Sequence, residues 1–270
     1  MSISQVVSVE VLGVLTALLS LVPTGQAVAQ ACRAAGGAGT GALVELYTSE
    51  GCSSCPPAER WLGTLAQTEI AAGRLVPLAL HVGYWDHLGW KDPYAQPVFV
   101  TRQQAIRDRL RARYIYTPQV VVAGRDFRDW HAAGFASELK RVNAQASRAT
   151  VALSFDRNAA GGPRYAVEST IPNPTDRPDA ELFLALTESG LSNEVKAGEN
   201  RGETLHHAHV VRRWHGPITY DARGVANFNA APDAAILATA RTSRVGLAAF
   251  VQNRASGAVL QAVGLAACPL

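Results

Sequence analysis

The residues best suited to chemistry in this chain are two cysteines separated by two serines. The segment Cys52-Ser53-Ser54-Cys55 follows a short apolar run, and Pro56-Pro57 comes directly after it, where proline is tolerated in the first turn of a helix. We therefore expect the cysteines at a strand-to-helix junction. A helix N-terminus lowers the pKa of a thiol because unpaired N–H groups and the helix dipole stabilise the thiolate, which is the form that attacks a disulfide.

This placement predicts a reversible dithiol couple. Cys52 is the expected attacking thiolate, and Cys55 is close enough to resolve the mixed disulfide that forms. A zinc site would need a second pair of ligands, and Cys32 and Cys268 are poorly spaced for one. Two alternatives stay open: a copper or other metal site made by Cys52, Cys55 and His81, and a permanent structural bridge between Cys52 and Cys55.

The start of the chain predicts export. Residues 11–22 are mostly apolar and precede Ala27-Val28-Ala29, which is typical of a signal peptide over residues 1–29. The apolar run is too short for a membrane-spanning helix, which needs about 20 residues. We expect a periplasmic or secreted protein, where disulfides persist and a bridge between Cys32 and Cys268 would tie the two ends together.

Two further groups of residues are candidates for serving the dithiol. Glu45 lies in an otherwise apolar strand before the cysteines, and a buried carboxylate with a raised pKa could accept the proton of the resolving thiol. The alternative is an acid paired with one of the many arginines. The Trp-rich segment after residue 83 suits either a peptide groove or a small core. The predicted groove residues are Tyr84, Trp85, His87 and Trp90.

A histidine cluster is the other notable pattern. On a strand, His207 and His209 would share one face and could bind a metal with a third ligand, and His206 lies beside them. No acid or cysteine has the local spacing to complete such a site. Surface histidines or hydrogen-bonded structural histidines are therefore favoured.

The elements around the dithiol alternate as in an α/β protein. This β-α-β-α-β-β-α succession favours a largely parallel sheet covered on both faces. The predicted strands are 43–47, 75–82, 120–122 and 126–130, and the predicted helices begin at Pro56 and span about 99–114 and 134–147.

Beyond residue 148 the apolar periodicity changes to two, which is typical of antiparallel strands. Short strands with Pro- and Gly-rich connections predict a small antiparallel β-sandwich that orients or docks partners. We therefore expect an α/β domain at 42–147 and a β-sandwich-like domain at 148–268. The predicted strands are 151–155, 165–171, 181–187, 206–214, 245–252 and 259–265.

Composition and charge exclude several classes of protein. Of the 270 residues, 48% are hydrophobic and 17% are charged, which argues against disorder, collagen and coiled coil. The net charge is +3, and the basic residues are scattered rather than gathered in a nucleic-acid footprint. We expect no nucleic-acid partner and no membrane span.

The motifs together resemble the thioredoxin superfamily over about residues 42–147. More narrowly, the chain resembles a family of secreted bacterial thioredoxin-like proteins, domain of unknown function 1223 (DUF1223). The motifs that carry this resemblance are residues 44–58, Tyr84-Trp85-Asp86, residues 89–93 and Tyr116-Thr117-Pro118-Gln119.

The resemblance implies a thiol-disulfide oxidoreductase with a thioredoxin-like domain. In it Cys52 attacks, Cys55 resolves, Pro118 is a cis-proline that faces the dithiol, and Thr117 offers backbone groups to an extended peptide. No small-molecule cofactor is implied, only a protein thiol or disulfide as partner. The Ser-Ser dipeptide and the proline directly after Cys55 depart from thioredoxin, so its redox potential does not transfer to this chain.

Overall fold

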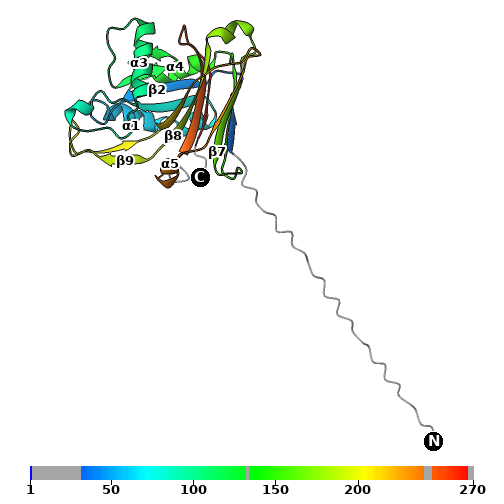
Figure 1. Cartoon of the computed structure of the whole chain (residues 1–270). Helices are drawn as coiled ribbons and strands as arrows, with labels where there is room; N and C mark the ends of the chain where they lie inside the picture. The colour runs from blue at the N-terminus through cyan, green and yellow to red at the C-terminus, as the bar shows by residue number, and fades with distance from the viewer. Residues whose placement is uncertain (2–31, 132–133, 240–244, 267–270) are drawn as a thin grey trace.

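The computed structural model describes residue 1 and residues 32–131, 134–239 and 245–266. Most of the predicted signal peptide, and Cys268 of the predicted Cys32–Cys268 bridge, lie outside the described residues. The described part is a mixed α/β structure made mostly of sheet (Figure 1). None of its helices is both long and apolar enough to cross a membrane.

The elements of the described residues fall into three sheets and the helices that cover them. The strands are β1 (Cys32–Ala35), β2 (Ala42–Thr48), β3 (Leu75–His81), β4 (Gln119–Val122), β5 (Arg125–Asp126), β6 (Thr150–Asp156), β7 (Arg164–Thr170), β8 (Ala180–Glu188), β9 (Leu191–Glu194), β10 (Thr204–His207), β11 (Val210–Ile218), β12 (Val225–Ala230), β13 (Val245–Asn253) and β14 (Val259–Leu265). The helices are α1 (Pro56–Thr64), α2 (Gln67–Ala71), α3 (Pro97–Leu110), α4 (Gly134–Asn143) and α5 (Ala234–Thr239), with short 3-10 helices at Asp86–Leu88 and Pro174–Asp179. The large sheet has the order β14-β13-β8-β11-β3-β2-β4-β5, a second sheet has the order β1-β6-β7-β12, and β9 pairs with β10.

The expected largely parallel sheet is wrong. Parallel pairing is confined to β3, which lies between β2 and β11, and the other pairs of the large sheet are antiparallel. A helical crossover joins β2 to β3 and allows them to run parallel, whereas the hairpin of β4 and β5 reverses the chain. The hairpin turns at Ala123-Gly124, where both residues have positive φ.

Helices cover both faces of the large sheet at the end that carries the cysteines. β2 is buried along its whole length, as its apolar sequence predicts for a strand covered on both sides. Its Leu43 and Tyr47 pack in the same cluster as residues of α3, and Val44 and Leu46 pack in the same cluster as residues of α1. α1 and α3 therefore lie on opposite faces of the sheet (Figure 1).

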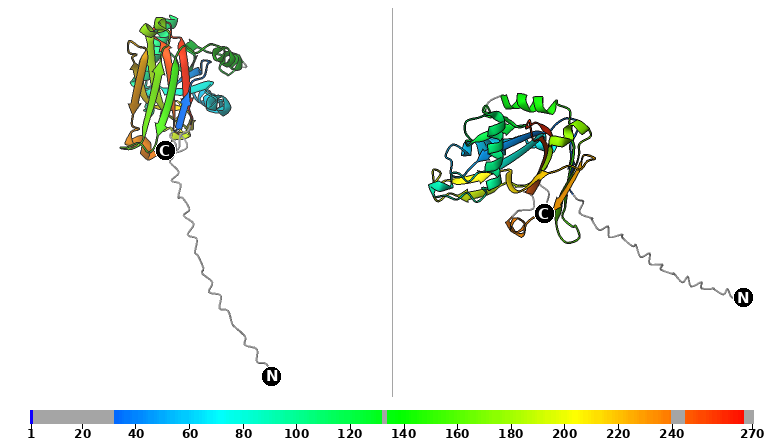
Figure 2. Two further views of the ribbon diagram at one scale, coloured as in Figure 1. Left: turned by 90° about the vertical axis from the view of Figure 1, so that its right-hand side faces the viewer. Right: turned by 45° about the horizontal axis from the view of Figure 1, so that its top comes forward.

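The second sheet packs face to face against β8, β13 and β14. Alternate residues of β6 and β7 are buried, in agreement with the period of two in the sequence, and they join a core cluster with these three strands. The left view of Figure 2 turns the strands of this layer toward the viewer. Strands from both sides of residue 148 share the large sheet, so the division into two domains stays a prediction.

Several elements differ from the predicted ones at polar or short segments. The strand expected at 206–214 is two strands, because the chain breaks between β10 and β11, where His209 has a φ of 58°. The strand expected at 126–130 is only the two residues of β5. β1, β9 and β12 were not predicted, since their short or polar sequences carry little apolar alternation.

Candidate functional site

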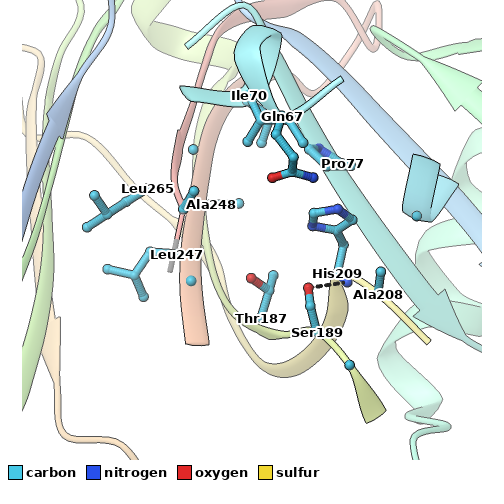
Figure 3. A pocket seen from close by; sticks show the side chains of 16 residues that line it. Gln67, Ile70, Pro77, Thr187, Ser189, Ala208, His209, Leu247, Ala248 and Leu265 are labelled. Atoms are coloured by element: carbon cyan, nitrogen blue, oxygen red, sulfur yellow. Dashed lines mark hydrogen bonds between the residues drawn. The ribbon is translucent and has the colours of Figure 1, made fainter. Parts of the chain in front are cut away.

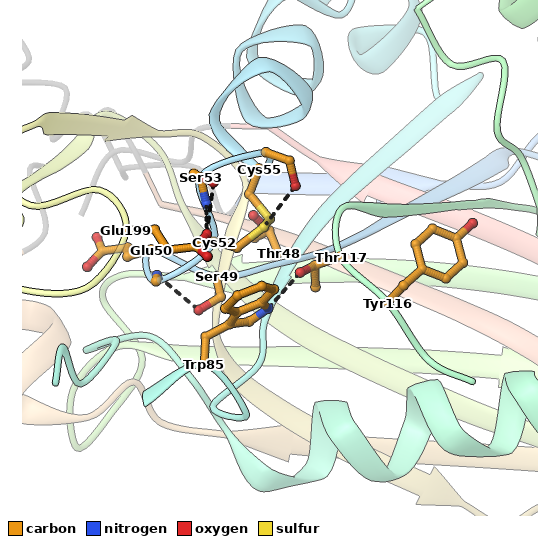
Figure 4. The surroundings of a disulfide bond; sticks show 12 residues. Thr48, Ser49, Glu50, Cys52, Ser53, Cys55, Trp85, Tyr116, Thr117 and Glu199 are labelled. Carbon is orange, nitrogen blue, oxygen red and sulfur yellow. Dashed lines mark hydrogen bonds between the residues drawn. A yellow bond between two sulfur atoms is a disulfide. The ribbon is translucent and has the colours of Figure 1, made fainter. Parts of the chain in front are cut away.

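Cys52 and Cys55 form a disulfide at the start of α1 (Figure 4). Their Cα atoms are 5.5 Å apart, and neither residue is exposed to solvent. The N–H of Cys52 donates to the carbonyl oxygen of Ser49, and the N–H of Cys55 donates to that of Cys52. The predicted strand-to-helix junction is confirmed, with Cys55 as the N-cap of α1.

The first turn of α1 offers a thiolate fewer donors than the sequence suggested. Pro56-Pro57 has no N–H groups, and the next two N–H groups of the helix donate to the carbonyl oxygen of Cys55. The Oγ of Ser54 lies 3.3 Å from the Sγ of Cys52, so its hydroxyl is the donor within reach of this sulfur. Stabilisation of a Cys52 thiolate therefore rests on the helix dipole and on Ser54.

Trp85 lies against the cysteine loop. Its Nε1 donates to the Oγ1 of Thr117 at 2.8 Å, and Figure 4 shows both side chains beside the disulfide. A Cβ added to Gly51 would come within 2.9 Å of the Cβ of Trp85, so this close approach requires glycine. The peptide bond between Thr117 and Pro118 is cis, which confirms the cis-proline that the resemblance implied.

The other predicted groove residues are spread around the site. The Nε1 of Trp90 donates to the Oε2 of Glu50 at 2.8 Å, whereas the hydroxyl of Tyr84 donates to Gln103 of α3 at 3.3 Å. His87 is exposed. Of the predicted groove residues, Trp85 and Trp90 thus contact the cysteine loop and its neighbours.

A hollow of about 390 Å³ lies beside the cis-proline. The sequence did not assign its aromatic residues to the site, because they come from separate segments on either side of β4 that no local pattern links. The residues that line it are Tyr114, Tyr116, Pro118, Val120, Phe127, Arg128 and Trp130.

Glu45 faces α3, on the opposite side of the sheet from α1. Its carboxylate is buried and ion-paired with Arg102, whose Nε donates to Glu45 Oε1 at 2.6 Å, and Tyr47 donates its hydroxyl to the same oxygen at 3.1 Å. Burial, assisted by the Glu45 charge, raises the pKa of Tyr47 well above its usual value. These surroundings are those of the alternative interpretation, an acid paired with an arginine.

The loop between β9 and β10 holds the cysteine loop in place. Ser53 donates its N–H and its hydroxyl to the Oε2 of Glu199, at 2.9 and 2.8 Å. The amide of Asn200 donates to the carbonyl oxygens of Glu50 and Cys52, at 2.8 and 3.0 Å. Asn200 follows Cys52 by 148 residues, and no local pattern linked the two.

A buried group of three carboxylates and two histidines lies next to the cysteine loop. We call Glu50, Glu59, His81, Asp92 and His207 the Glu-His cluster. His207 bonds through Nε2 to Glu50 at 2.8 Å and through Nδ1 to Glu59. His81 bonds through Nδ1 to Asp92 at 2.8 Å, and Asp92 also accepts the N–H of Glu50 at 2.8 Å. The cluster connects the segment before the cysteines with α1, β3 and β10.

The members of the cluster shift one another's pKa values. Burial by itself lowers the pKa of His207, but its hydrogen bonds with Glu50 and Glu59 outweigh burial and raise that pKa to about 10. Asp92 likewise raises the pKa of His81 against the effect of burial. Burial tends to raise the pKa values of Glu59 and Asp92, and their histidine partners nevertheless lower both. Buried opposite charges therefore compensate one another here.

The sequence suggested that His81 could share a metal ion with the two cysteines. In the structure, other residues lie close enough to His81 for this. Among the described residues, Glu59, His81 and His207 bring ligand atoms within 4.8 Å of one another, and neither cysteine belongs to this set. The Nε2 of His81 has no hydrogen-bond partner in the part of the chain that the structure describes. His207 is a buried, hydrogen-bonded histidine, as one of the favoured interpretations held, and His206 is exposed.

A separate cavity of about 330 Å³ lies between α2, β3, β8, β13 and β14 (Figure 3). Gln67, Pro77, Thr187 and His209 are among the residues that line it. Burial lowers the pKa of His209 to about 4. Neither a cysteine nor a member of the Glu-His cluster lines this cavity, so it is distinct from the cysteine site.

The model of a family described as "Protein of unknown function (DUF1223)" matches residues 43–252. No curated protein matches the chain. A crystal structure of protein AGR_C_4864 from Agrobacterium tumefaciens is 24% identical, with a TM-score of 0.61 over 85% of this chain and 95% of that one. HBP35 of Porphyromonas gingivalis is 14% identical, with a TM-score of 0.60 over 87% of this chain and 78% of that one. At these identities the likeness concerns the fold alone.

Proposed function

Because the chain belongs to the DUF1223 family, whose description names no reaction, we propose a function from its own site: thiol-disulfide exchange by Cys52 and Cys55. The observation that carries this proposal is the disulfide at the N-terminus of α1, with Trp85 and the cis Thr117–Pro118 bond beside it. A pair of cysteines with two residues between them can form and reopen such a bond without large backbone movement.

The arrangement of elements supports a thioredoxin-like fold for residues 42–147 as part of the proposal. The succession of strands and α-helices β2-α1-α2-β3-α3-β4-β5-α4, with strands in the order β3-β2-β4-β5, places the cysteines at the first helix and the cis-proline just before β4. Residues 148–268 then act as a β-sandwich-like extension, and the contacts of Glu199 and Asn200 with the cysteine loop give this extension a part in the site.

The exchange reaction moves two electrons through a mixed disulfide. A thiolate of the partner attacks the Sγ of Cys52, the bond to Cys55 breaks, and Cys55 leaves as a thiolate that takes up a proton. A second partner thiolate then attacks the partner sulfur of the mixed disulfide, which releases Cys52 as a thiolate and the partner as a disulfide. In the reverse direction, Cys52 attacks a partner disulfide and Cys55, after losing its proton, resolves the intermediate.

Burial of the disulfide means that exchange requires an opening step. Both cysteines are fully covered, and Trp85, which is partly exposed, is held by one side-chain hydrogen bond to Thr117. Movement of the indole frees the Thr117 hydroxyl and uncovers the loop from the side of the cis-proline. We assign Trp85 the role of this cover.

The partner in this proposal is a protein thiol or disulfide in an oxidising compartment. The aromatic hollow beside Pro118, which includes Tyr116 and Trp130, suits an apolar side chain of a partner peptide. The predicted signal peptide supports export to the periplasm or beyond, where such partners carry disulfides.

A second candidate function is favoured by the same burial. If the cover never opens, Cys52–Cys55 is a permanent bridge in a binding module, fixed by the contacts of Glu199 and Asn200. The two candidates differ in whether the bond can be reduced in the folded protein.

Trapping with oxidised glutathione tests the exchange proposal. Reduced Cys55→Ser protein should form a stable mixed disulfide between glutathione and Cys52, because the resolving thiol is gone. Reduced Cys52→Ser protein is the matched control and should react much more slowly at Cys55. Peptide mass spectrometry separates both from Cys32 and Cys268. No adduct at Cys52, or equal reaction in the two variants, would refute the assigned roles.

A further inference from the structure

We propose that the Glu-His cluster is a divalent metal site, with Glu59, His81 and His207 as ligands of an ion of the Zn²⁺ class. The proposal concerns different residues from the cysteine pair and does not depend on thiol-disulfide exchange. It rests on the geometry of the three ligand groups, on the unpartnered nitrogen of His81 and on how this chain compensates its buried acids.

The three ligand groups already lie close enough to share one ion. One carboxylate oxygen and two imidazole nitrogens, all within 4.8 Å of one another, come from Glu59, His81 and His207. Two imidazoles and a glutamate are a ligand set that zinc sites use, with bonds of about 2.0–2.2 Å. The two histidines are fully buried or nearly so, and Glu59 is 7% exposed.

Both histidines are held as metal-binding histidines are held. A ligand histidine almost always donates its second ring N–H to a carboxylate or carbonyl, which fixes the ring and the tautomer. His81 bonds through Nδ1 to Asp92, which leaves Nε2 for a metal. His207 bonds through Nε2 to Glu50, and its Nδ1, which is hydrogen-bonded to Glu59 in the metal-free chain, would exchange that bond for one to the metal. Asp92 and Glu50 are therefore the outer carboxylates of the proposed site.

The Nε2 of His81 supplies an independent sign of a missing ligand. It belongs to a side chain with no exposure and has no hydrogen-bond partner among the described residues. Leaving such a group unpaired costs about 1–3 kcal/mol in a protein interior. A metal ion at this nitrogen satisfies it, and the ring is already oriented by Asp92.

The way this chain compensates its other buried acids sets the cluster apart. The described residues include six buried acids, and three of them are paired with arginine. These three pairs are Glu45–Arg102, Asp176–Arg148 and Glu188–Arg212. The other three, Glu50, Glu59 and Asp92, have no lysine or arginine among their hydrogen-bond or ion-pair partners in the described part of the chain.

Three buried carboxylates beside two histidines need positive charge to be stable in a low-dielectric interior. One divalent ion bound by the neutral imidazoles would supply two positive charges to these carboxylates. The cluster thus matches a dication in charge as well as in ligand type. Thr48, Trp90 and Asn193 donate hydrogen bonds to Glu59 and Glu50 and hold these carboxylates in place.

Metal binding to the oxidised full-length chain tests the proposal. With Cys52–Cys55 closed as a disulfide, these thiolates cannot act as ligands. Calorimetric titration with Zn²⁺ should give one ion per chain, and Co²⁺ should give visible absorption bands of a site with nitrogen and oxygen ligands. His81→Gln should weaken binding at least about 100-fold, and Asp92→Asn should weaken it about 10–100-fold because it removes an outer carboxylate.

His206→Gln is the matched control, because His206 is the exposed neighbour of His207 and should leave binding unchanged. If circular dichroism shows that His81→Gln does not fold, the zinc affinity of Asp92→Asn tests the proposal instead. Absence of stoichiometric binding to the oxidised chain would overturn the proposal, as would binding that both variants leave unchanged. Binding that requires reduction and is lost in Cys52→Ser would instead place the metal at the thiols and overturn it as well.

Discussion

Replacing Trp85 by alanine should accelerate reduction of the Cys52–Cys55 disulfide by a small reductant. Both cysteines are fully buried, the Cβ of Trp85 lies close to Gly51, and the indole donates to Thr117 at 2.8 Å. If the indole is the cover, its removal eliminates the free energy that must otherwise be supplied to open the site before the sulfur is attacked.

The size of the effect follows from the contacts of the indole. Its hydrogen bond contributes about 1 kcal/mol net. Full burial of a large apolar side chain contributes about 1.5–3 kcal/mol, so a partly exposed indole contributes about 1 kcal/mol. The sum of about 2 kcal/mol corresponds to a rate increase of about 30-fold for Trp85→Ala. Trp85→Phe keeps a ring but loses the donor, so its increase should be about 5-fold.

The assay is the rate of reduction by dithiothreitol, followed by alkylation and mass spectrometry of the peptide that carries both cysteines. Trp61→Ala is the control, because Trp61 is another partly buried tryptophan, on α1, and its ring packs against Trp130 and Phe135. Its rate should equal that of the unmodified chain. An unchanged or slower rate in Trp85→Ala would refute the role of the indole. Equal acceleration in Trp61→Ala would show that lower stability, not uncovering, exposes the bond.

Four further predictions concern the surroundings of the site and the fold. Ser54→Ala should raise the pKa of the attacking thiol by about one unit, because it removes the hydroxyl donor 3.3 Å from the sulfur, and the pH dependence of iodoacetamide alkylation of the reduced protein measures this pKa. Glu45→Gln should reduce the free energy of unfolding in urea by about 3–5 kcal/mol, because it leaves Arg102 buried without its counter-charge. It should leave the dithiothreitol rate of the folded protein unchanged, since Glu45 lies on the face opposite α1, and a slower rate would restore its predicted proton-accepting role. Asn200→Ala should cost about 2 kcal/mol in the same unfolding measurement, because the carbonyl oxygens of Glu50 and Cys52 each lose one hydrogen bond, and a loss below the error of the titration would contradict this. Burial lowers the pKa of His215 from 6.5, so near and below pH 6.5 the unfolded chain binds more protons than the folded one, and the free energy of unfolding should fall as the pH decreases. His215→Gln should flatten this part of the plot of unfolding free energy against pH, and an unaltered slope would contradict the lowered pKa of His215.

The sequence predicted the parts of the site that depend on local signals. An apolar run followed by a turn and two prolines is enough to predict a strand, a loop with Cys52 and Cys55, and a helix that begins at Pro56. The residues Thr117-Pro118 before a Val-rich run were likewise sufficient to predict the cis bond through the resemblance. These features are decided by residues within one turn or one strand.

The remainder of the site depends on contacts between distant segments. Asn200 and His207 reach the cysteine loop only because β9 and β10 pack beside α1, and nothing within either segment signals this partner. Glu45 illustrates a different limit. Alternation along β2 shows that Glu45 and Tyr47 share a face, but the sequence does not tell which face α1 covers. The acids that lie next to the cysteine loop, Glu50 and Glu59, flank the motif and carried no distinguishing pattern.

The most direct test of the proposed exchange activity is a redox titration of the folded protein in glutathione and dithiothreitol buffers, with thiols mapped by mass spectrometry. Peptide mapping reads Cys52 and Cys55 separately from Cys32 and Cys268. We predict a reversible two-electron transition of the Cys52–Cys55 pair with a midpoint between about −270 and −120 mV, the range of known oxidoreductases. A pair that stays oxidised below about −300 mV while the protein remains folded would contradict exchange and identify a permanent structural bridge.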